Sequence, residues 1–348
     1  MHRPRLLRLV TVLLVAALLP SCGARSRAGA HPSVASSLVS ASTSTSAAPT
    51  PGTATTAGTA GTAGTAGTQP TTTTAVASSG PCGWAATPPP TYQHVIWIWM
   101  ENHSWPQVLG DRRAAPYEVS LATQCATATA YRTVGSPSLP NYIGATAGGT
   151  QGITDDGSPA AHTLTVDNLF RQVRAAGGTE RSYQEDMAQP CQLSSGGQYA
   201  VKHNPAAYYA GPSGQDRAAC RADDVPFSAW AADLQAGHLP TFAFITPNLC
   251  HDTHDCSVAT GDAWLARELP PILTSARYRE GRTAVLVVWD EDSPVPNIMI
   301  GPAVHPGRAV SQPFDHFALL RTTEELLALP GRLGAAASAP SLRSLFNL

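Results

Sequence analysis

Three short polar clusters follow apolar runs in this 348-residue sequence, and their residue types suit metal-assisted hydrolysis. Glu101–Ser104 follows the first apolar run, His251–Asp255 follows the second, and Asp290–Asp292 follows the third. Carboxylates and amides are oxygen ligands for divalent cations, and imidazoles can transfer protons. One such cluster is typical of a solvated turn, whereas three that converge in space predict a hydrolytic site that holds a metal.

Ser138 is the candidate nucleophile. It lies between Pro137 and Pro140, whose fixed φ angles should hold the backbone stiffly. A hydroxyl presented rigidly near a cation is what covalent phosphoryl transfer needs, because the serine must lose its proton as it attacks. The alternative for an isolated motif of this kind is a proline-rich surface turn.

The apolar runs themselves predict β-strands that are buried on both faces. These strands are expected at His94–Met100, Thr241–Thr246, Ala284–Trp289 and Asn297–Ile300. Helical spacing predicts helices at Val166–Ala176, Phe227–Ala236, Ala263–Arg277 and Ala318–Leu329. Strands that alternate with helices indicate an α/β fold with a mostly parallel central sheet. Ligands bind beyond the carboxyl ends of such strands, so the three polar clusters are expected to meet there.

Together these blocks resemble the bacterial phosphoesterase family of the alkaline-phosphatase-like superfamily, which contains acid phosphatases and phospholipases C. The matching stretches run in the family's order from about residue 90 to the C-terminus. They include Met100–Ser104, Pro137–Tyr142, Ser182–Asp186, Lys202–Pro205, Asp252–Asp255, Gly261–Leu265, Trp289–Asp292 and His316. The resemblance implies a three-layer α/β sandwich, with helices on both sides of a mostly parallel sheet.

The resemblance also implies roles for individual residues. Ser138 corresponds to the residue that forms a covalent phosphoenzyme, and His254 and His316 fall near the leaving group and the phosphate. The residues expected to hold a divalent ion are Glu101, Asn102, Asp290 and Glu291. Substrate contacts are expected from His103, Asn141, Lys202, His203, His251 and Asp252, although Lys202 and His203 could instead stabilise a loop. Because the expected metal ligands are all oxygen donors, calcium, magnesium or manganese is favoured over a thiolate-type zinc site.

Charge and cysteine content restrict the function further. The net charge is −2, and no basic cluster lies outside the N-terminal segment, which disfavours nucleic-acid binding. Without Cys22, six cysteines remain, an even number that suits an exported, disulfide-bonded domain. Their proximity along the chain predicts the pairs Cys82–Cys125, Cys191–Cys220 and Cys250–Cys256. A zinc knuckle is the alternative, but no pair has C-x-x-C spacing.

The N-terminal region predicts export and attachment to a membrane. Residues 1–21 read as a lipoprotein-type signal peptide, with basic residues before the apolar run Leu9–Leu19 and Cys22 as the acylated first residue of the mature chain. An ordinary secretory peptide is the alternative. Residues 22–80 are almost wholly Ala, Ser, Thr, Gly and Pro, and predict a disordered tether. Residues 81–348 are then the catalytic domain.

The predicted function is an exported acid phosphatase that hydrolyses phosphate monoesters through a phosphoserine intermediate with a divalent metal. Its substrate would be a small phosphate ester or a lipid headgroup, at the surface of the membrane. One alternative is a phospholipase C-type phosphodiesterase. Another is a non-catalytic surface lipoprotein on the same fold, although Ser138 and the Asp290–Glu291 pair are both present.

Overall fold

The computed structural model describes residues 80–348. The predicted signal peptide, the acylated Cys22 and all but the last residue of the predicted tether lie outside this range. Within it, no helix is long and apolar enough to span a membrane.

Ten strands form two sheets in the described part of the chain. The strands are β1 His94–Met100, β2 Ala126–Ala128, β3 Tyr131–Arg132, β4 Glu180–Gln184, β5 Asp224–Pro226, β6 Phe242–Thr246, β7 Thr283–Trp289, β8 Asn297–Ile300, β9 Arg308–Val310 and β10 Phe314–Asp315. The main sheet has eight strands in the order β5-β4-β6-β1-β7-β8-β2-β9, and β10 pairs with β3 in a small second sheet. Strands β5, β4, β6, β1 and β7 are mutually parallel, and β8 runs antiparallel to both of its neighbours.

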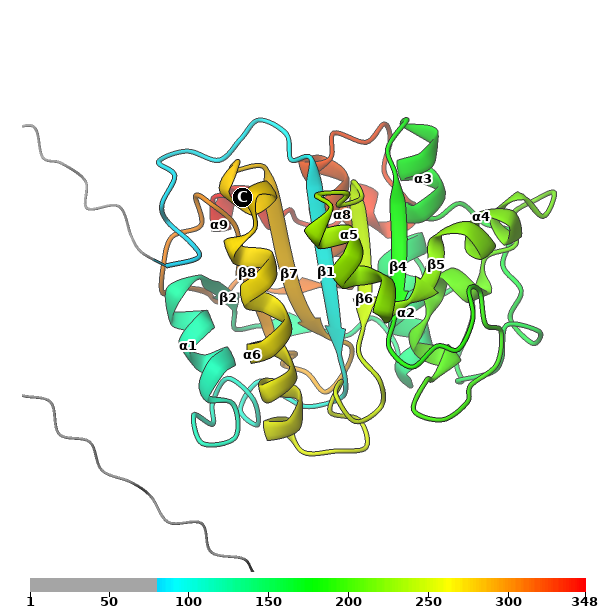
Figure 1. Ribbon diagram of the computed structural model, residues 1–348, viewed down its shortest axis with the longest axis horizontal. Helices are drawn as coiled ribbons and strands as arrows, with labels where there is room; N and C mark the ends of the chain where they lie inside the picture. The colour runs from blue at the N-terminus through cyan, green and yellow to red at the C-terminus, as the bar shows by residue number, and fades with distance from the viewer. Residues whose placement is uncertain (1–79) are drawn as a thin grey trace, which may run out of the picture. The chain divides into compact units, whose positions relative to one another are not determined.

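Helices cover both faces of the main sheet (Figure 1). The α-helices are α1 Pro116–Gln124, α2 Ser138–Ala147, α3 Leu169–Ala175, α4 Gln215–Asp223, α5 Trp230–Gln235, α6 Val258–Thr274, α7 Ala276–Arg279, α8 His316–Leu326 and α9 Arg343–Phe346. The short 3₁₀ helices are η1 Val201–His203, η2 Pro205–Tyr208, η3 Phe227–Ala229 and η4 Gly334–Ala337. Helix α6 packs with α1, and helix α2 packs with α8.

The alternating side chains of β1 explain why this strand is apolar throughout. Trp97 and Trp99 point to one face, where Trp97 Nε1 donates to Thr323 of α8 at 3.0 Å and the Trp99 ring lies 4.7 Å from that of Tyr142 in α2. Met100 points to the other face and contacts Gly261 of α6. A strand covered by helices on both faces has no side chain left for solvent.

The predicted α/β architecture is confirmed, with differences at individual elements. The strands expected near residues 94, 241, 284 and 297 all form, but the last of them, β8, is antiparallel to β7. Helix α6 begins at Val258, five residues before the predicted start, because Gly261 lies inside the helix against Met100. The expected helix at 227–236 is a 3₁₀ turn followed by α5.

All three predicted disulfides are confirmed: Cys82–Cys125, Cys191–Cys220 and Cys250–Cys256. Asp224 lies close to Cys191 and Cys220, but the two sulfurs are bonded to each other and supply no thiolate for a metal.

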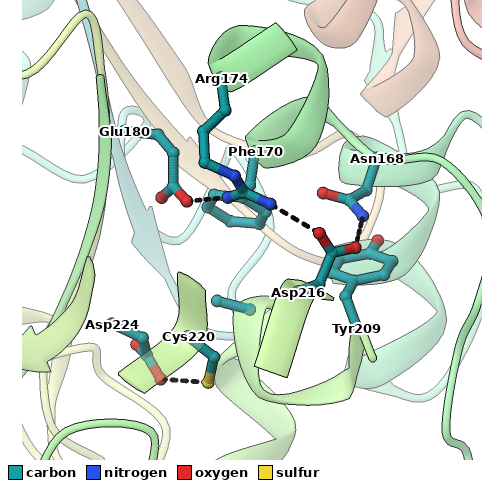
Figure 2. Close-up of a pocket in the computed structure, with 9 residues that line it drawn as sticks. Asn168, Phe170, Arg174, Glu180, Tyr209, Asp216, Cys220 and Asp224 are labelled. Atoms are coloured by element: carbon teal, nitrogen blue, oxygen red, sulfur yellow. Dashed lines mark hydrogen bonds and ion pairs between the residues drawn. The ribbon is translucent and has the colours of Figure 1, made fainter. Parts of the chain in front are cut away.

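An ion-pair cluster fastens α3 and α4 to the edge of the sheet beside the second disulfide. Figure 2 shows the guanidinium of Arg174 between the carboxylates of Glu180 and Asp216. Asp216 also pairs with Arg171 at 2.6 Å and accepts a hydrogen bond from Asn168 at 3.2 Å. The gap that these side chains enclose has a volume of about 10 Å³, the space of a single water molecule, so the cluster is structural.

Candidate active site

Ser138 is the first residue of α2, and its hydroxyl is buried against a carboxylate. Its Oγ donates a hydrogen bond to Oε2 of Glu101 at 3.1 Å, and both residues are at most 1% exposed. Proline is tolerated in the first turn of a helix, so Pro137 and Pro140 start α2 where the sequence predicted only a stiff turn. Asn141 fastens this turn, because its side chain accepts from the backbone of Val134 and Gly135 and donates to the Gly135 carbonyl.

Glu101 lies at the centre of a buried polar network at the carboxyl end of β1. Its Oε1 accepts a hydrogen bond from the Tyr142 hydroxyl at 2.6 Å. Nε2 of His203 lies 3.0 Å from the same oxygen, within ion-pair distance but not aligned for a hydrogen bond. Burial, and then repulsion from Asp290 and Asp252, raise the pKa of Glu101 well above its usual range. The network therefore favours the binding of a proton or a cation beside Glu101.

His203 is held by Asp252 on its far side. Nδ1 of His203 lies 3.1 Å from Oδ2 of Asp252, and burial followed by the charge of Lys202 lowers the pKa of His203 well below its usual range. This shift favours the neutral imidazole, and the tautomer that donates Nδ1–H to Asp252 turns its Nε2 lone pair toward Glu101. A histidine that donates one N–H to a carboxylate is the usual arrangement of a metal ligand. Asp252 is fully buried and contacts His203 where the sequence predicted a substrate contact.

Asp290 follows β7 and is fully buried, yet neither of its side-chain oxygens has a hydrogen-bond partner. Its backbone N–H donates to the Met100 carbonyl, which places it beside Glu101 across the neighbouring strand. Burial, and then repulsion from Glu291, raise the pKa of Asp290 well above its usual range, and the proximity of Glu101 and Ser138 lowers it in part. A carboxylate in this position needs a proton or a cation as its counterpart.

These donors fit a divalent cation. The ligand atoms of Glu101, His203 and His254 all lie within 4.8 Å of one another, and the unpartnered oxygens of Asp290 lie nearby. Glu101 and Asp290 were expected as ligands, whereas His203 and His254 add two nitrogen donors that the sequence had assigned to other roles. The all-oxygen ligand set stays a prediction; if His203 and His254 also bound the ion, the mixed set of nitrogen and oxygen donors would suit transition metals and zinc as well.

The more exposed rim of the site carries the remaining charged groups. Lys202 Nζ lies 3.0 Å from Oδ2 of Asp156 and 3.3 Å from Nε2 of His254, whose Nδ1 contacts Asp255 at 2.7 Å. Asn102 and Glu291, both expected as metal ligands, are half-buried, and Asn102 Nδ2 donates to Glu291 Oε1 at 3.5 Å.

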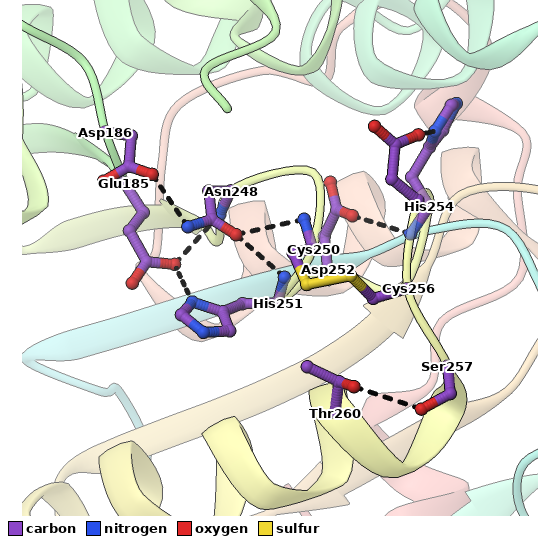
Figure 3. The surroundings of a disulfide bond; sticks show 11 residues. Glu185, Asp186, Asn248, Cys250, His251, Asp252, His254, Cys256, Ser257 and Thr260 are labelled. Carbon is purple, nitrogen blue, oxygen red and sulfur yellow. Dashed lines mark hydrogen bonds and ion pairs between the residues drawn. A yellow bond between two sulfur atoms is a disulfide. The ribbon is translucent and has the colours of Figure 1, made fainter. Parts of the chain in front are cut away.

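His254 and Asp252 belong to a loop between β6 and α6 that the Cys250–Cys256 disulfide closes (Figure 3). Asp252 Oδ1 accepts from the backbone N–H of His254 at 2.8 Å, which fixes the direction of the loop. Figure 3 shows His251 turned away from His254, with Nδ1 of His251 2.9 Å from Oε2 of Glu185. His251 thus anchors the loop and does not join the cluster around Ser138, contrary to the expected substrate contact.

Two further sequence expectations change in the structure. His316 is fully buried, donates from Nε2 to the Asp290 carbonyl at 2.6 Å and accepts at Nδ1 from the Tyr131 hydroxyl at 3.2 Å. Burial lowers its pKa to about 4, and its contact with the Asp290 carbonyl supports that residue; a role near the leaving group stays a prediction. Asn141 is likewise engaged in its own turn. His103 is half-buried beside Glu101 in the chain, and its Nε2 has no hydrogen-bond partner.

Two residues of the site were not predicted. Tyr142 donates to Glu101, and Asp156 contacts both Lys202 and the N-terminus of α2. Tyr142 stood in the matching stretch Pro137–Tyr142, where its spacing of four from Ser138 places both on one side of a helix. Asp156 carried no signal beyond its position in a polar loop.

The structure thus combines a mixed α/β sheet, carboxylates that follow β1 and β7, and a buried serine at the start of α2. The fold matches an alkaline phosphatase superfamily protein of Vibrio parahaemolyticus with a TM-score of 0.51 and 12% identity, over 74% of this chain and 72% of that one. It also matches the lipoteichoic acid synthase LtaP of Listeria monocytogenes with a TM-score of 0.52 and 8% identity, over 74% and 76% of the two chains. At this level of identity the likeness concerns the fold alone.

The chain belongs to the phosphoesterase family, whose profile matches residues 99–294. It is 32% identical over 271 residues to a phosphatidylinositol-3-phosphatase of Mycobacterium tuberculosis, covering 76% of this chain and 86% of that protein. It is 29% identical over 208 residues to a phosphate-repressible acid phosphatase of Penicillium chrysogenum, covering 58% and 48%. The predicted family is thereby confirmed, as is the enzyme class of phosphoric monoester hydrolase.

Proposed function

We propose that this protein is an exported acid phosphatase that uses Ser138 as a nucleophile toward phosphate monoesters. Ser138 begins α2, and its buried hydroxyl donates a hydrogen bond to Glu101. This contact is the observation that carries the proposal. A serine must lose its proton as it attacks phosphorus, and the carboxylate of Glu101 is the group to which the Ser138 hydroxyl already donates that proton. Ser138 also lies beside Asp290, whose side-chain oxygens have no hydrogen-bond partner, and this adds to the support.

In the first step the Oγ–P bond would form as the bond from phosphorus to the leaving oxygen breaks, and the serine proton passes to Glu101. The leaving oxygen takes a proton from the Lys202–His254 pair at the rim. In the second step the oxygen of a water forms a bond to phosphorus as the Oγ–P bond breaks; the water proton passes to the Lys202–His254 pair, the proton on Glu101 returns to Oγ of Ser138, and inorganic phosphate leaves. The backbone N–H of Leu139, directly after the nucleophile, is oriented to receive a phosphoryl oxygen once Asp156 has moved away.

Glu101, Asp290 and His203 are the residues that would hold a divalent ion, with His254 in reach. Such an ion would neutralise charge on the phosphoryl oxygens and favour the ionised form of the serine. His316 and Asp252 keep Asp290 and His203 in place. Incubation with a chelator should therefore abolish turnover, and addition of a single divalent metal should restore it.

The proposed substrate class includes lipid phosphates such as phosphoinositides, because a relative that aligns over most of both chains is named a phosphatidylinositol-3-phosphatase. Export is supported by the three disulfides of the described domain, which form in oxidising compartments. Attachment through an acylated Cys22 is part of the same proposal. Cys22→Ser should then move the protein from the membrane fraction into the medium.

The decisive experiment compares Ser138→Ala with Ser136→Ala; Ser136 is an exposed serine of the same turn whose side chain makes no hydrogen bond to another of the described residues. Ser138→Ala should lower kcat for p-nitrophenyl phosphate about a thousandfold or more, and Asp290→Asn should cost about as much. The double variant should lose little more, because groups that act as a unit fail together. Ser136→Ala should keep wild-type activity.

Mass spectrometry after acid quenching should find phosphate on Ser138 in the wild type, and a parallel quench in denaturant at mildly alkaline pH preserves any phosphohistidine, which acid would hydrolyse. Retention of most activity in Ser138→Ala, or phosphate on a histidine, would refute the serine mechanism. Activity on bis(p-nitrophenyl) phosphate equal to that on the monoester would instead indicate a phosphodiesterase.

A further inference from the structure

A carboxylate lies where the nucleophile helix would receive an anion. Oδ1 of Asp156 accepts a hydrogen bond from the backbone N–H of Leu139 at 3.0 Å, and Leu139 follows Ser138 directly. Oδ2 of the same carboxylate lies 3.0 Å from Nζ of Lys202. Asp156 therefore spans the N-terminus of the ten-residue helix α2 and the ammonium group at the rim of the site.

These two donors are the ones that a phosphoryl group on Ser138 would need. The N–H groups at the start of a helix attract anions, and an N–H beside the nucleophile can stabilise charge that develops on the transferred group. Lys202 supplies a full positive charge within reach of His254. Ser138 itself, whose hydroxyl would carry the phosphoryl group, immediately precedes Leu139 and is buried against Glu101.

The contact between Asp156 and Lys202 changes the charge that an incoming phosphate group meets. Nζ of Lys202 lies 3.0 Å from Oδ2 of Asp156 and 3.3 Å from Nε2 of His254, so it is the cation nearest to this part of the site. As long as Asp156 pairs with Lys202, the ammonium is partly neutralised toward an incoming anion.

We propose that Asp156 is an internal competitor of the substrate: its carboxylate occupies the phosphate position, and a doubly charged phosphate monoester displaces it more readily than a singly charged diester. This makes Asp156 a residue that determines specificity, and the inference rests on the function proposed above. A monoester carries the second negative charge near neutral pH, whereas a diester has only one ionisable oxygen. Competition by charge therefore favours the monoester.

The surroundings of Asp156 allow its side chain to leave without movement of the loop. The side chain is 28% exposed. The neighbouring backbone is held at both sides, since Asp155 accepts from the N–H of Gly157 at 2.7 Å and contacts His162, and the Tyr208 hydroxyl donates to the Gly157 carbonyl at 2.9 Å. Rotation of the Asp156 side chain toward solvent is enough to release both Leu139 and Lys202.

The test compares Asp156→Asn with Asp155→Asn at pH 7 and constant ionic strength. Asparagine keeps an oxygen that can accept from Leu139 and removes the charge that faces Lys202, whereas Asp155 is the adjacent exposed carboxylate without a contact to Lys202. Asp156→Asn should lower the inhibition constant of inorganic phosphate about two- to fivefold, the effect of one partly exposed charge contact. The ratio of kcat/KM for bis(p-nitrophenyl) phosphate to that for p-nitrophenyl phosphate should rise by a similar factor.

Asp155→Asn should change neither quantity. An unchanged or weaker phosphate inhibition in Asp156→Asn, or an unchanged diester ratio, would overturn the proposal and leave Asp156 as a support for Lys202. If Asp156→Asn lowers the melting temperature, Asp156→Ser provides a second neutral variant that should show the same gain. Calorimetric titration of inorganic phosphate into Ser138→Ala, with and without Asp156→Asn, reports the competition without turnover. Failure of the proposed function would show as no hydrolysis by the wild type, while this titration would still decide the role of Asp156.

Discussion

Replacement of Asp224 by asparagine should reduce the loss of stability that the protein suffers as the pH rises from mildly acidic to alkaline values. Asp224 begins β5 and is 1% exposed. Its Oδ2 accepts a hydrogen bond from Asn204 Nδ2 at 2.8 Å, while its Oδ1 has no hydrogen-bond partner. Figure 2 shows the contact between Asp224 and the sulfur of Cys220. Burial raises the pKa of this carboxyl to about 7, against the smaller opposing effect of hydrogen bonds from Asn204 and Ser182.

The direction of the stability change with pH follows from the pKa of the Asp224 carboxyl in the unfolded and the folded protein. In the unfolded chain the carboxyl titrates near 3.8, whereas the folded protein keeps the proton up to about pH 7. The stabilisation is therefore fully present below pH 3.8 and is lost as the pH rises through 7. At about 1.4 kcal/mol for each tenfold change in proton affinity, the complete loss is about 4 kcal/mol, and more than half of it, roughly 2–3 kcal/mol, falls between about pH 5 and pH 8.

Urea denaturation of the mature protein at pH 5 and pH 8 measures this difference. Asparagine has the shape of the protonated acid, so Asp224→Asn should resemble the wild type at pH 5 and lose roughly 2–3 kcal/mol less on going to pH 8. Asp167→Asn is the matched control, because its side chain is 55% exposed, and it should follow the wild type at both pH values. If the free energy of unfolding of Asp224→Asn falls between pH 5 and pH 8 as much as that of the wild type, the assignment of a buried proton to Asp224 is refuted.

Two further predictions concern the support of the catalytic groups. Tyr142→Phe removes the buried donor to Glu101, so kcat for p-nitrophenyl phosphate should fall about ten- to a hundredfold with little change in KM; an unchanged kcat would show that the hydroxyl has no catalytic consequence. The double variant Cys250→Ser/Cys256→Ser frees the loop that carries His254 and should lower the free energy of unfolding by about 2 kcal/mol and kcat about tenfold. Equal kcat in that variant and the wild type would mean that hydrogen bonds alone hold the loop.

The sequence determined the sheet and the strand-end part of the site. A continuous apolar run such as His94–Met100 is specific for a strand covered on both faces, and the residue after such a run lies at a known edge of the sheet. Glu101 and Asp290 follow β1 and β7, which are adjacent and parallel, and the structure brings them together as expected. Cysteine pairs close in the chain were also predicted correctly, because short loops close at low entropic cost.

Only the tertiary structure decided which partners complete the site. Tyr142 and His203 reach Glu101, and Asp156 reaches the backbone N–H of Leu139, from segments that do not end strands. Asp156 has no local pattern that distinguishes it from other polar residues, and the contacts of Tyr142 and His203 with Glu101 could not be read from their positions in the chain. The same holds for His316, which lies near Asp290 in space but faces its backbone instead of the open side of the site. Side-chain direction and burial depend on how helices pack over the sheet, and they determine whether a histidine binds a metal, transfers a proton or supports a neighbour.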